Sequence, residues 1–436
     1  MRVLFLTLPA KAHLYPQVPL AWALRAAGHE VCIAGNPDLT AEIARTGLTA
    51  VPVGAALDQA GMVERNQERE REQSALSGDG PDPEELLKWT ELEPGALDHT
   101  ALQGLFTVAT TLVFRTYSPD RTLDELVAFA REWRPDLVIW DTLVLAGPVV
   151  AKAVGAAHAR LLYGLDLIGH MREQYLHGLD ARPLPLREDP VEEWLAPVLD
   201  RYDTAFSEDV VTGQWTIDPV PTSMRLPVDL PYLPMRHIPY NGRAVIPHWL
   251  TEPPERPRVC LTLGLSLREV LGGDRASVRT LLDAVADLDL EVVATLDAEQ
   301  LSGVSRLPDN VRAFDFVPLN ELLPSCSAIV HQGGFGQVQT ALAHGVPQLS
   351  LPNGQWDTVP RAQQIQDSGV GLRAADVDHC EAGDLRQMLV RLVEEPAFAR
   401  TAAAVRGEML ATPAPHDIVP VLERLSAEHR LPAGPA

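Results

Sequence analysis

The sequence lacks the features that several broad classes of protein require. Its 436 residues include 36 basic and 59 acidic side chains, a net charge of −23, so it has no basic excess with which to bind nucleic acid or an anionic membrane. It has no apolar run long enough for a transmembrane helix, and its apolar start, Arg2–Leu8, is too short for a secretion signal. We therefore expect a cytoplasmic protein.

Cysteine is scarce too, and it is spread along the chain. Three of the four cysteines (Cys32, Cys260, Cys326 and Cys380) lie in or beside apolar, strand-like runs. Their spacing fits no metal site, so small core residues are the simpler interpretation.

Apolar strands and helices alternate twice along the chain, and this pattern predicts the fold class. Two doubly wound α/β domains with parallel sheets are expected, and such sheets bind ligands at the carboxyl ends of their strands. The expected elements in the first half are the strands Arg2–Leu8, Glu30–Ala34 and Pro135–Trp140 and the helix Val18–Ala27. Those in the second half are the strands Arg258–Leu263, Glu291–Leu296, Ser327–Val330 and Gln348–Leu351 and the helices Val278–Leu288, Val359–Ser368 and Ile418–Leu425.

Proline marks the boundary between the two halves. The tract 219–257 contains several prolines and is predicted to be an extended linker. The expected division is a first domain at 1–218, this linker, a second domain at 258–417 and a terminal segment at 418–436. Within the first domain, the charge-dense stretch 61–87 is predicted to be a solvated helix and a mobile loop.

A glycine-rich turn between a strand and a helix is the most informative stretch. His331 ends a β-branched run, and Gly333, Gly334 and Gly336 lead into an Ala/Leu-rich helix that runs to Gly345. Glycines allow a ligand close to the backbone, and the exposed N–H groups and dipole of a helix start favour an anion. The sequence therefore predicts a diphosphate site, with His331 as a side-chain donor beside it.

Two common phosphate motifs do not fit this turn. A P-loop would need Gly-Lys-Ser/Thr, and a dinucleotide fingerprint would need a third glycine where Gln339 stands. A glycine-rich turn that only caps a helix is the alternative that the turn alone leaves open.

The residues around this turn carry a longer pattern. It resembles the donor-sugar motif of inverting GT-B glycosyltransferases, above all the actinobacterial enzymes that attach nucleotide-activated deoxysugars to macrolides and aromatic polyketides. The resemblance covers nearly the whole chain and is weakest between Leu57 and Arg121. The matching elements are His331-x-Gly-Gly-x-Gly336, Thr340-Ala341, Gly345-Val-Pro-Gln348, Leu351-Pro352, Trp356-Asp357 and Arg361-Ala362.

The resemblance implies a catalytic pair in the first half. His13 follows the first strand and precedes Pro16, which matches the family's His-x-x-Pro element, where this His is the general base; by position alone a structural or solvated His is as plausible. A His of near-neutral pKa suits the removal of a proton from an acceptor hydroxyl. Asp141 follows the strand that ends at Trp140, and a carboxylate there would orient His13. The alternative for Asp141 is a helix cap after Thr142.

The nucleotide end of the donor site is assigned by the same resemblance. Phe316 matches an aromatic residue that stacks on the nucleobase, and the backbone of Val317 would read the edge of the base; the alternative for Phe316 is an ordinary core side chain. Gly264 and Ser266 match the loop that reaches the pyrophosphate from the first strand of the second domain, with a plain strand-ending turn as the alternative.

The sugar end of the donor site shows two departures from the common pattern. Asp357 matches the acidic residue that binds sugar hydroxyls, but Thr358 stands where relatives with hexose donors have Gln. We therefore expect a thymidine-diphosphate (TDP) deoxysugar as the donor. Gln337 stands where Ser or Thr usually donates to the phosphate, which leaves that contact open.

No cofactor and no metal is expected beyond the nucleotide sugar itself. The pairs Asp287–Asp289 and Asp376–Asp378 fit the Asp-x-Asp metal pattern of other glycosyltransferases, but solvated charges are the simpler interpretation. Two other functions remain open: a nucleotide-sugar epimerase of the same architecture, and a non-catalytic sugar-nucleotide-binding scaffold protein.

The expected partners are a TDP-sugar donor and a lipophilic acceptor, whose pocket would be lined by segments between Leu57 and Arg121. No nucleic acid and no membrane is expected. The resemblance also brings in a P450-like auxiliary protein that would dock near Glu64–Glu72, Pro83–Leu92 and Leu105–Phe114, against the alternative of a solvated helix beside a mobile loop. A homodimer is a further prediction.

Overall fold

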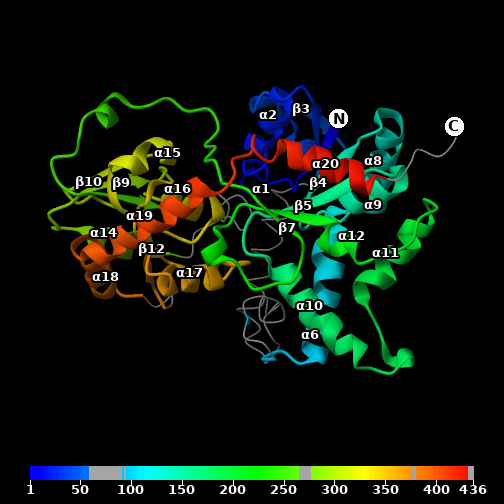
Figure 1. The fold of residues 1–436 in the computed structure, drawn as a ribbon. Coiled ribbons are helices and arrows are strands. Elements are labelled where there is room, and N and C mark those ends of the chain that lie inside the picture. The colour runs from blue at the N-terminus through cyan, green and yellow to red at the C-terminus, as the bar shows by residue number, and fades with distance from the viewer. Residues whose placement is uncertain (58–90, 93–94, 265–275, 376–379, 431–436) are drawn as a thin grey trace.

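The computed structural model describes residues 1–57, 91–92, 95–264, 276–375 and 380–430. Figure 1 shows two lobes, each with a sheet at its centre and helices around it. In the described part of the chain, no helix is both long and apolar enough to cross a membrane.

The sheet of the first domain is parallel throughout the described residues, with seven strands in the order β3-β2-β1-β4-β5-β6-β7. All five residues of β4 and of β5 are buried, as expected for parallel strands that helices cover on both faces. The strands are β1 (Arg2–Leu6), β2 (Glu30–Gly35), β3 (Thr49–Pro52), β4 (Leu137–Asp141), β5 (Ala157–Leu161), β6 (Trp215–Asp218) and β7 (Tyr232–Pro234).

Helices flank this sheet and extend below it on one side (Figure 1). One stretch, η2 (Ala109–Phe114), is a π-helix continuous with its neighbours. The α-helices are α1 (Lys11–Leu14), α2 (Val18–Ala26), α3 (Thr40–Arg45), α6 (His99–Val108), α7 (Arg115–Tyr117), α8 (Asp120–Trp133), α9 (Ala146–Val154), α10 (Leu167–Asp180), α11 (Pro190–Asp200) and α12 (Asp209–Thr212). The 3₁₀ turns are η1 (Pro37–Leu39), η3 (Leu184–Leu186), η4 (Thr222–Met224) and η5 (His248–Thr251).

The second domain repeats this architecture with a parallel sheet of six described strands, in the order β10-β9-β8-β11-β12-β13. The strands are β8 (Arg258–Thr262), β9 (Glu291–Thr295), β10 (Val311–Phe314), β11 (Cys326–His331), β12 (Gln348–Ser350) and β13 (Gly371–Arg373). The helices are α14 (Val278–Val285), α15 (Leu319–Leu322), η6 (Leu323–Ser325), α16 (Phe335–His344), α17 (Thr358–Asp367), α18 (Ala382–Glu394), α19 (Pro396–Ala411) and α20 (Val419–His429). Cys32, Cys260 and Cys326 lie in strands of the two sheets.

The tract 219–257, which the sequence predicts as a linker, contains the strand β7 at Tyr232–Pro234. β7 pairs with β6 and adds the last strand to the first sheet. The tract also touches α19: the N–H of Ser223 lies 2.9 Å from Glu408 Oε1, and the N–H of Arg236 lies 2.7 Å from Pro413 O. The first sheet therefore extends to Pro234, and the tract that follows is packed against the second domain.

The last helix, α20, lies across the first domain, as Figure 1 shows in red. Ile418, Val419 and Leu422 join the apolar core beneath β1 and β4. Ser426 Oγ donates a hydrogen bond of 3.1 Å to the carbonyl of Asp136 just before β4. The last described helix thus packs on the first domain, although it follows the second domain in the sequence.

The strand order of each sheet determines where a ligand can bind. In the first sheet the order reverses between β1 and β4, and in the second it reverses between β8 and β11. The loops that leave two such strands turn to opposite faces, which opens a crevice at their carboxyl ends. His13, Asp141, Gly264 and the glycine-rich turn lie at or just after the ends of these four strands, whereas Phe316 follows β10 and Asp357 follows β12.

Candidate active site

His13 and Asp141 meet at the crevice of the first sheet. His13 lies in the single helical turn α1 after β1, and Asp141 is the last residue of β4. His13 Nδ1 lies 2.7 Å from Asp141 Oδ2, and their side chains are 12% and 1% exposed. Because a carboxylate only accepts, Nδ1 carries a proton, so in the neutral ring Nε2 is the nitrogen with the lone pair. This is the tautomer that a general base needs.

Asp141 is fixed in place by its own backbone. Its Oδ1 accepts a hydrogen bond of 3.0 Å from the N–H of Leu143. Helix α9 begins further on, and the N–H of Ala146 is bound by Ser118 Oγ at 2.9 Å. Asp141 therefore does not cap α9, and its other oxygen serves His13.

His331, which is fully buried, supports the glycine-rich turn after β11 through hydrogen bonds. The N–H of Gly333 donates to His331 Nδ1 and His331 Nε2 donates to Gln348 Oε1, both at 2.9 Å. Burial, the largest cause, lowers the pKa of His331 to about 4, so the ring is neutral. Both ring nitrogens are engaged here, so donation from His331 to a diphosphate would require one of these bonds to break.

Gly333 has a left-handed backbone conformation that few other residues could adopt. Its φ is +83°, and a Cβ at this position would approach the Cβ of Thr358 to 3.3 Å. The turn therefore packs directly on the start of α17, which carries the predicted sugar-binding residues.

Gln337 folds back over the start of its own helix. Its Oε1 accepts from the N–H of Gly334 at 3.1 Å, and its Nε2 lies 3.4 Å from the carbonyl of Thr262 at the end of β8. Gly264 lies against the same side chain, so Gln337 joins the loops after β8 and β11. Gly336, in the first turn of α16, accepts from Thr340 Oγ1, and Ser266 lies outside the described residues.

Asp357 and Thr358 begin α17, and each is already hydrogen-bonded. Asp357 Oδ2 pairs with Arg361 and also accepts from the N–H of Leu165 in the first domain at 2.8 Å. Thr358 Oγ1 lies 2.8 Å from the carbonyl of Gln355. Arg361 also donates to the carbonyl of Gly333 at 2.7 Å, so one buried ion pair connects the glycine-rich turn to the other domain.

Phe316 and Val317 follow β10 and differ sharply in exposure. Phe316 is 50% exposed, which makes the core alternative wrong, whereas Val317 is 2% exposed. A half-exposed ring before a buried residue offers a flat face for a base.

No cation site is evident in the described part of the chain, where no three His, Cys, Asp or Glu side chains gather as metal ligands would. Asp289 instead pairs with Arg256 at 3.6 Å and is 91% exposed. The pair Asp376–Asp378 lies outside the described residues.

Sequence reasoning missed several side chains that the fold brings to these crevices. Tyr163, after β5, packs on His13. Tyr117 lies near Asp141, and its pKa is raised mainly by burial and also by the charge of Asp141. Under the glycine-rich turn, Gln332 Nε2 and Ser350 Oγ are buried with no hydrogen-bond partner among the described residues. For Tyr163, Gln332 and Ser350 the sequence signal was their place at or just after the end of a strand, whereas Tyr117 lies at the end of α7.

Comparison with known proteins gives the family of the chain. Residues 22–264 match the erythromycin biosynthesis protein CIII-like N-terminal domain, and residues 279–425 match the C-terminal domain of the same family. The chain belongs to this family. Aclacinomycin-T 2-deoxy-L-fucose transferase of Streptomyces galilaeus, a similar protein, is 55% identical over 100% of this chain and 98% of its own length. The 3-alpha-mycarosylerythronolide B desosaminyl transferase of Saccharopolyspora erythraea is 45% identical over 99% of this chain and 100% of its own.

A solved structure with a similar sequence agrees with the observed fold. The glycosyltransferase VinC, crystallised in complex with DTDP, has a TM-score of 0.84 and 42% identity over 98% of this chain and 100% of its own. The protein is thus a glycosyltransferase with the GT-B fold. The relatives named here are all transferases, so neither the epimerase nor the non-catalytic protein finds support.

Proposed function

We propose that the protein transfers a deoxysugar from a TDP-sugar to a hydroxyl group of a polyketide-type acceptor, with inversion at the anomeric carbon, in antibiotic biosynthesis. The observation that carries this proposal is the 2.7 Å contact between His13 and Asp141 at the crevice of the first sheet. The crevice of the second sheet holds the glycine-rich turn. The contact of Leu165 with Asp357 brings the carboxyl edges of the two sheets together.

The reaction follows from the protonation states in the first crevice. Nε2 of His13 takes the proton of the acceptor hydroxyl, while Asp141 stabilises the imidazolium that forms. The acceptor oxygen forms a bond to C1 of the sugar on the face opposite the nucleotide. The bond from C1 to the phosphate oxygen breaks, and its electron pair leaves with TDP, so the configuration at C1 inverts.

The leaving diphosphate meets the start of α16. The N–H groups of Phe335 and Gly336 stand at the positive end of this ten-residue helix, and the N–H of Gly334 would join them once Gln337 Oε1 is displaced. Donors in this position offset the growing charge. We propose that these groups replace a metal ion and that no cofactor takes part. Phe316 would carry the thymine and the backbone of Val317 would contact its edge, while Gly264 and Ser266 would approach the phosphates.

The proposed donor rests on two supports. One is Thr358 in place of Gln beside Asp357, since a sugar that has lost hydroxyls gives a Gln amide less to bind. The other is the DTDP in the complex with VinC, a protein 42% identical to this chain. The acceptor is proposed by likeness to relatives whose names specify erythronolide and aclacinomycin chemistry.

The proposed partners other than substrates are an auxiliary P450-like protein and a second copy of the chain. Glu64–Glu72 and most of Pro83–Leu92 lie outside the described residues. In Leu105–Phe114, both end residues are buried, whereas Leu112 is 59% exposed, so most of this apolar stretch serves the core. We also propose that the protein works in the cytoplasm.

The test is a matrix of purified protein with TDP- and UDP-sugars against a panel of polyketide aglycones, with and without a P450-like protein from the same organism. We expect a β- or α-linked product of configuration opposite to the donor, from TDP-deoxysugars and in the presence of EDTA. Clear preference for UDP-glucose, or retention of configuration, would contradict the proposal. Size-exclusion chromatography of the chain alone and with the auxiliary protein tests the two partners.

A further inference from the structure

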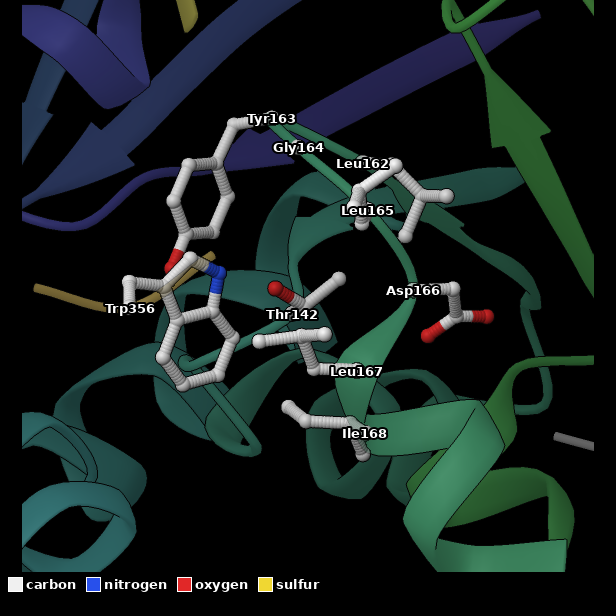
Figure 2. Close-up of a pocket in the computed structure, with 9 residues that line it drawn as sticks. All are labelled: Thr142, Leu162, Tyr163, Gly164, Leu165, Asp166, Leu167, Ile168 and Trp356. Atoms are coloured by element: carbon white, nitrogen blue, oxygen red, sulfur yellow. The ribbon is translucent and has the colours of Figure 1, made fainter. Parts of the chain in front are cut away.

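Tyr163 lies between the catalytic His13 and a side chain of the other domain. Its ring centroid is 3.9 Å from that of His13, with 43° between the planes. The same ring stacks on Trp356 of the second domain, with 6.0 Å between the centroids and 19° between the planes. Figure 2 shows the rings of Tyr163 and Trp356 side by side at the edge of a pocket that both line. Three rings thus connect the donor domain to the base.

The backbone beside Tyr163 is in direct contact with the donor domain. The N–H of Leu165 donates to Asp357 Oδ2 at 2.8 Å. A Cβ on Gly164 would stand 2.4 Å from Asp357 Oδ2 and 2.6 Å from Arg361 Nη2. Only a glycine permits this approach, so the ring contact and the ion pair belong to one interface.

The segment that carries Tyr163 is anchored within its own domain. Asp166 pairs with the guanidinium of Arg160 through two hydrogen bonds of 3.0 and 2.7 Å and also accepts from Tyr232 at 2.6 Å. Arg160 and Asp166 are almost fully buried. Tyr163 is therefore fixed to β5, and Trp356 reaches it from the second domain.

Trp356 is held in an unusual backbone conformation. Its φ is +47°, in the left-handed region that a bulky residue rarely adopts, and such conformations concentrate at functional sites. Burial and the charges of Asp141 and Asp357 raise the pKa of Tyr163 well above its ordinary value. The phenol stays neutral, so it acts on His13 by contact and not as a second base.

We infer that Tyr163 is a positioning residue through which Trp356 of the donor domain orients His13. A single hydrogen bond to Asp141 fixes one end of the imidazole but leaves the ring free to tilt about that bond. The face of Tyr163 restricts the tilt, and Trp356 supports Tyr163 only while the domains touch. His13 is then aligned for proton removal when the donor domain is in place. This inference rests on the proposed function, since it presupposes that His13 is the base.

The first test replaces the supporting ring. Trp356→Ala is expected to lower kcat at least tenfold while the KM values for donor and acceptor stay within twofold, because alignment of the base is lost and binding is not. Trp356→Phe, which keeps a ring, is expected to retain most of kcat. The matched control is Trp133→Ala at the end of α8, which packs on Phe129 far from the crevices and is expected to leave both constants unchanged.

The second test separates ring contact from hydroxyl chemistry. Tyr163→Phe is expected to retain kcat within twofold, whereas Tyr163→Leu is expected to lose as much as Trp356→Ala. The double variant Tyr163→Leu/Trp356→Ala should be no slower than either single variant, because both act through one contact. If Trp356→Ala does not fold, the kcat of Tyr163→Leu compared with that of Tyr163→Phe still tests whether the ring contact is needed.

Two results would overturn the inference: a donor KM that rises while kcat is unchanged in Trp356→Ala, or equal damage in Tyr163→Phe and Tyr163→Leu. Failure of the proposed function has a different signature. In that case the wild-type protein would transfer no sugar, whereas failure of the inference alone leaves wild-type transfer intact.

Discussion

Gln337 Oε1 accepts a hydrogen bond from the N–H of Gly334 at 3.1 Å, inside the turn where the diphosphate is proposed to bind. The helix thus caps its own start with a side chain that also reaches toward Thr262. A diphosphate that takes the Gly334 amide must first displace this carboxamide.

Replacing this cap should strengthen nucleotide binding. In Gln337→Ser the amide of Gly334 is free for the phosphate, and a buried hydrogen bond is worth about 0.5–1.5 kcal/mol. We expect TDP to bind roughly two- to tenfold tighter in isothermal titration calorimetry and the variant to melt at a lower temperature. Weaker binding of TDP would mean that Gln337 itself contacts the phosphate.

Removal of the base should abolish transfer and spare donor binding. His13→Ala is expected to lower kcat by about 10²–10⁴, the usual contribution of general base catalysis, with the Kd for TDP unchanged. Asp141→Asn should also lower kcat strongly, because an amide can donate to Nδ1 and stabilise the wrong tautomer. Initial rates and calorimetric titrations check both expectations, and a His13→Ala variant that keeps its turnover would exclude His13 as the base.

Loss of the exposed ring should weaken nucleotide binding. Phe316→Ala removes a stacking face worth about 1–3 kcal/mol per base, so the Kd for TDP should rise roughly five- to 150-fold. Phe316→Tyr keeps the face and serves as the control. Pyrophosphate, which has no base, should bind both variants equally. If pyrophosphate also binds Phe316→Ala more weakly, the substitution has distorted the phosphate site instead.

Buried histidine should make the protein sensitive to mild acid. The pKa of His331 is lowered to about 4 by burial, against about 6.5 in the unfolded chain. Between these two pKa values the unfolded state binds more protons than the folded state. The contribution of His331 to the free energy of unfolding is therefore fully present above pH 6.5. It falls by about 3 kcal/mol as the pH drops toward 4. His331→Phe should flatten that slope in urea titrations from pH 7.5 to 4.5.

The flattening should be partial, because the pKa of His237 is also lowered to about 4 and that of His158 is lowered as well. An unaltered slope in His331→Phe would show that His331 has the same pKa in the folded and the unfolded protein, and it would contradict this prediction.

The positions at the ends of parallel strands were predictable from sequence. Alternating strands and helices indicate parallel sheets, and the carboxyl ends of parallel strands form one edge, so His13 and Asp141 could be expected near one another. The same reasoning put the glycine-rich turn after His331 at the corresponding edge of the second sheet.

Other features depend on information that a local pattern does not contain. The contact of Tyr163 with Trp356 depends on the angle between two domains, and no periodicity in the chain encodes that angle. The hydrogen bonds of His331 and Gln337 depend on side-chain rotamers that only packing selects. The prolines around Tyr232–Pro234 predict a linker, whereas the structure has an edge strand there. An edge strand tolerates proline because only one of its sides pairs with a neighbouring described strand.

The position of α20 has a consequence for the synthesis of the protein. Ile418, Val419 and Leu422 belong to the core of the first domain, yet they are translated only after the whole of the donor domain. The domain that carries His13 must wait, with part of its apolar surface uncovered, until the donor domain has been made. A chain that terminates before α20 would therefore leave the core of the first domain incomplete, although that domain was translated first.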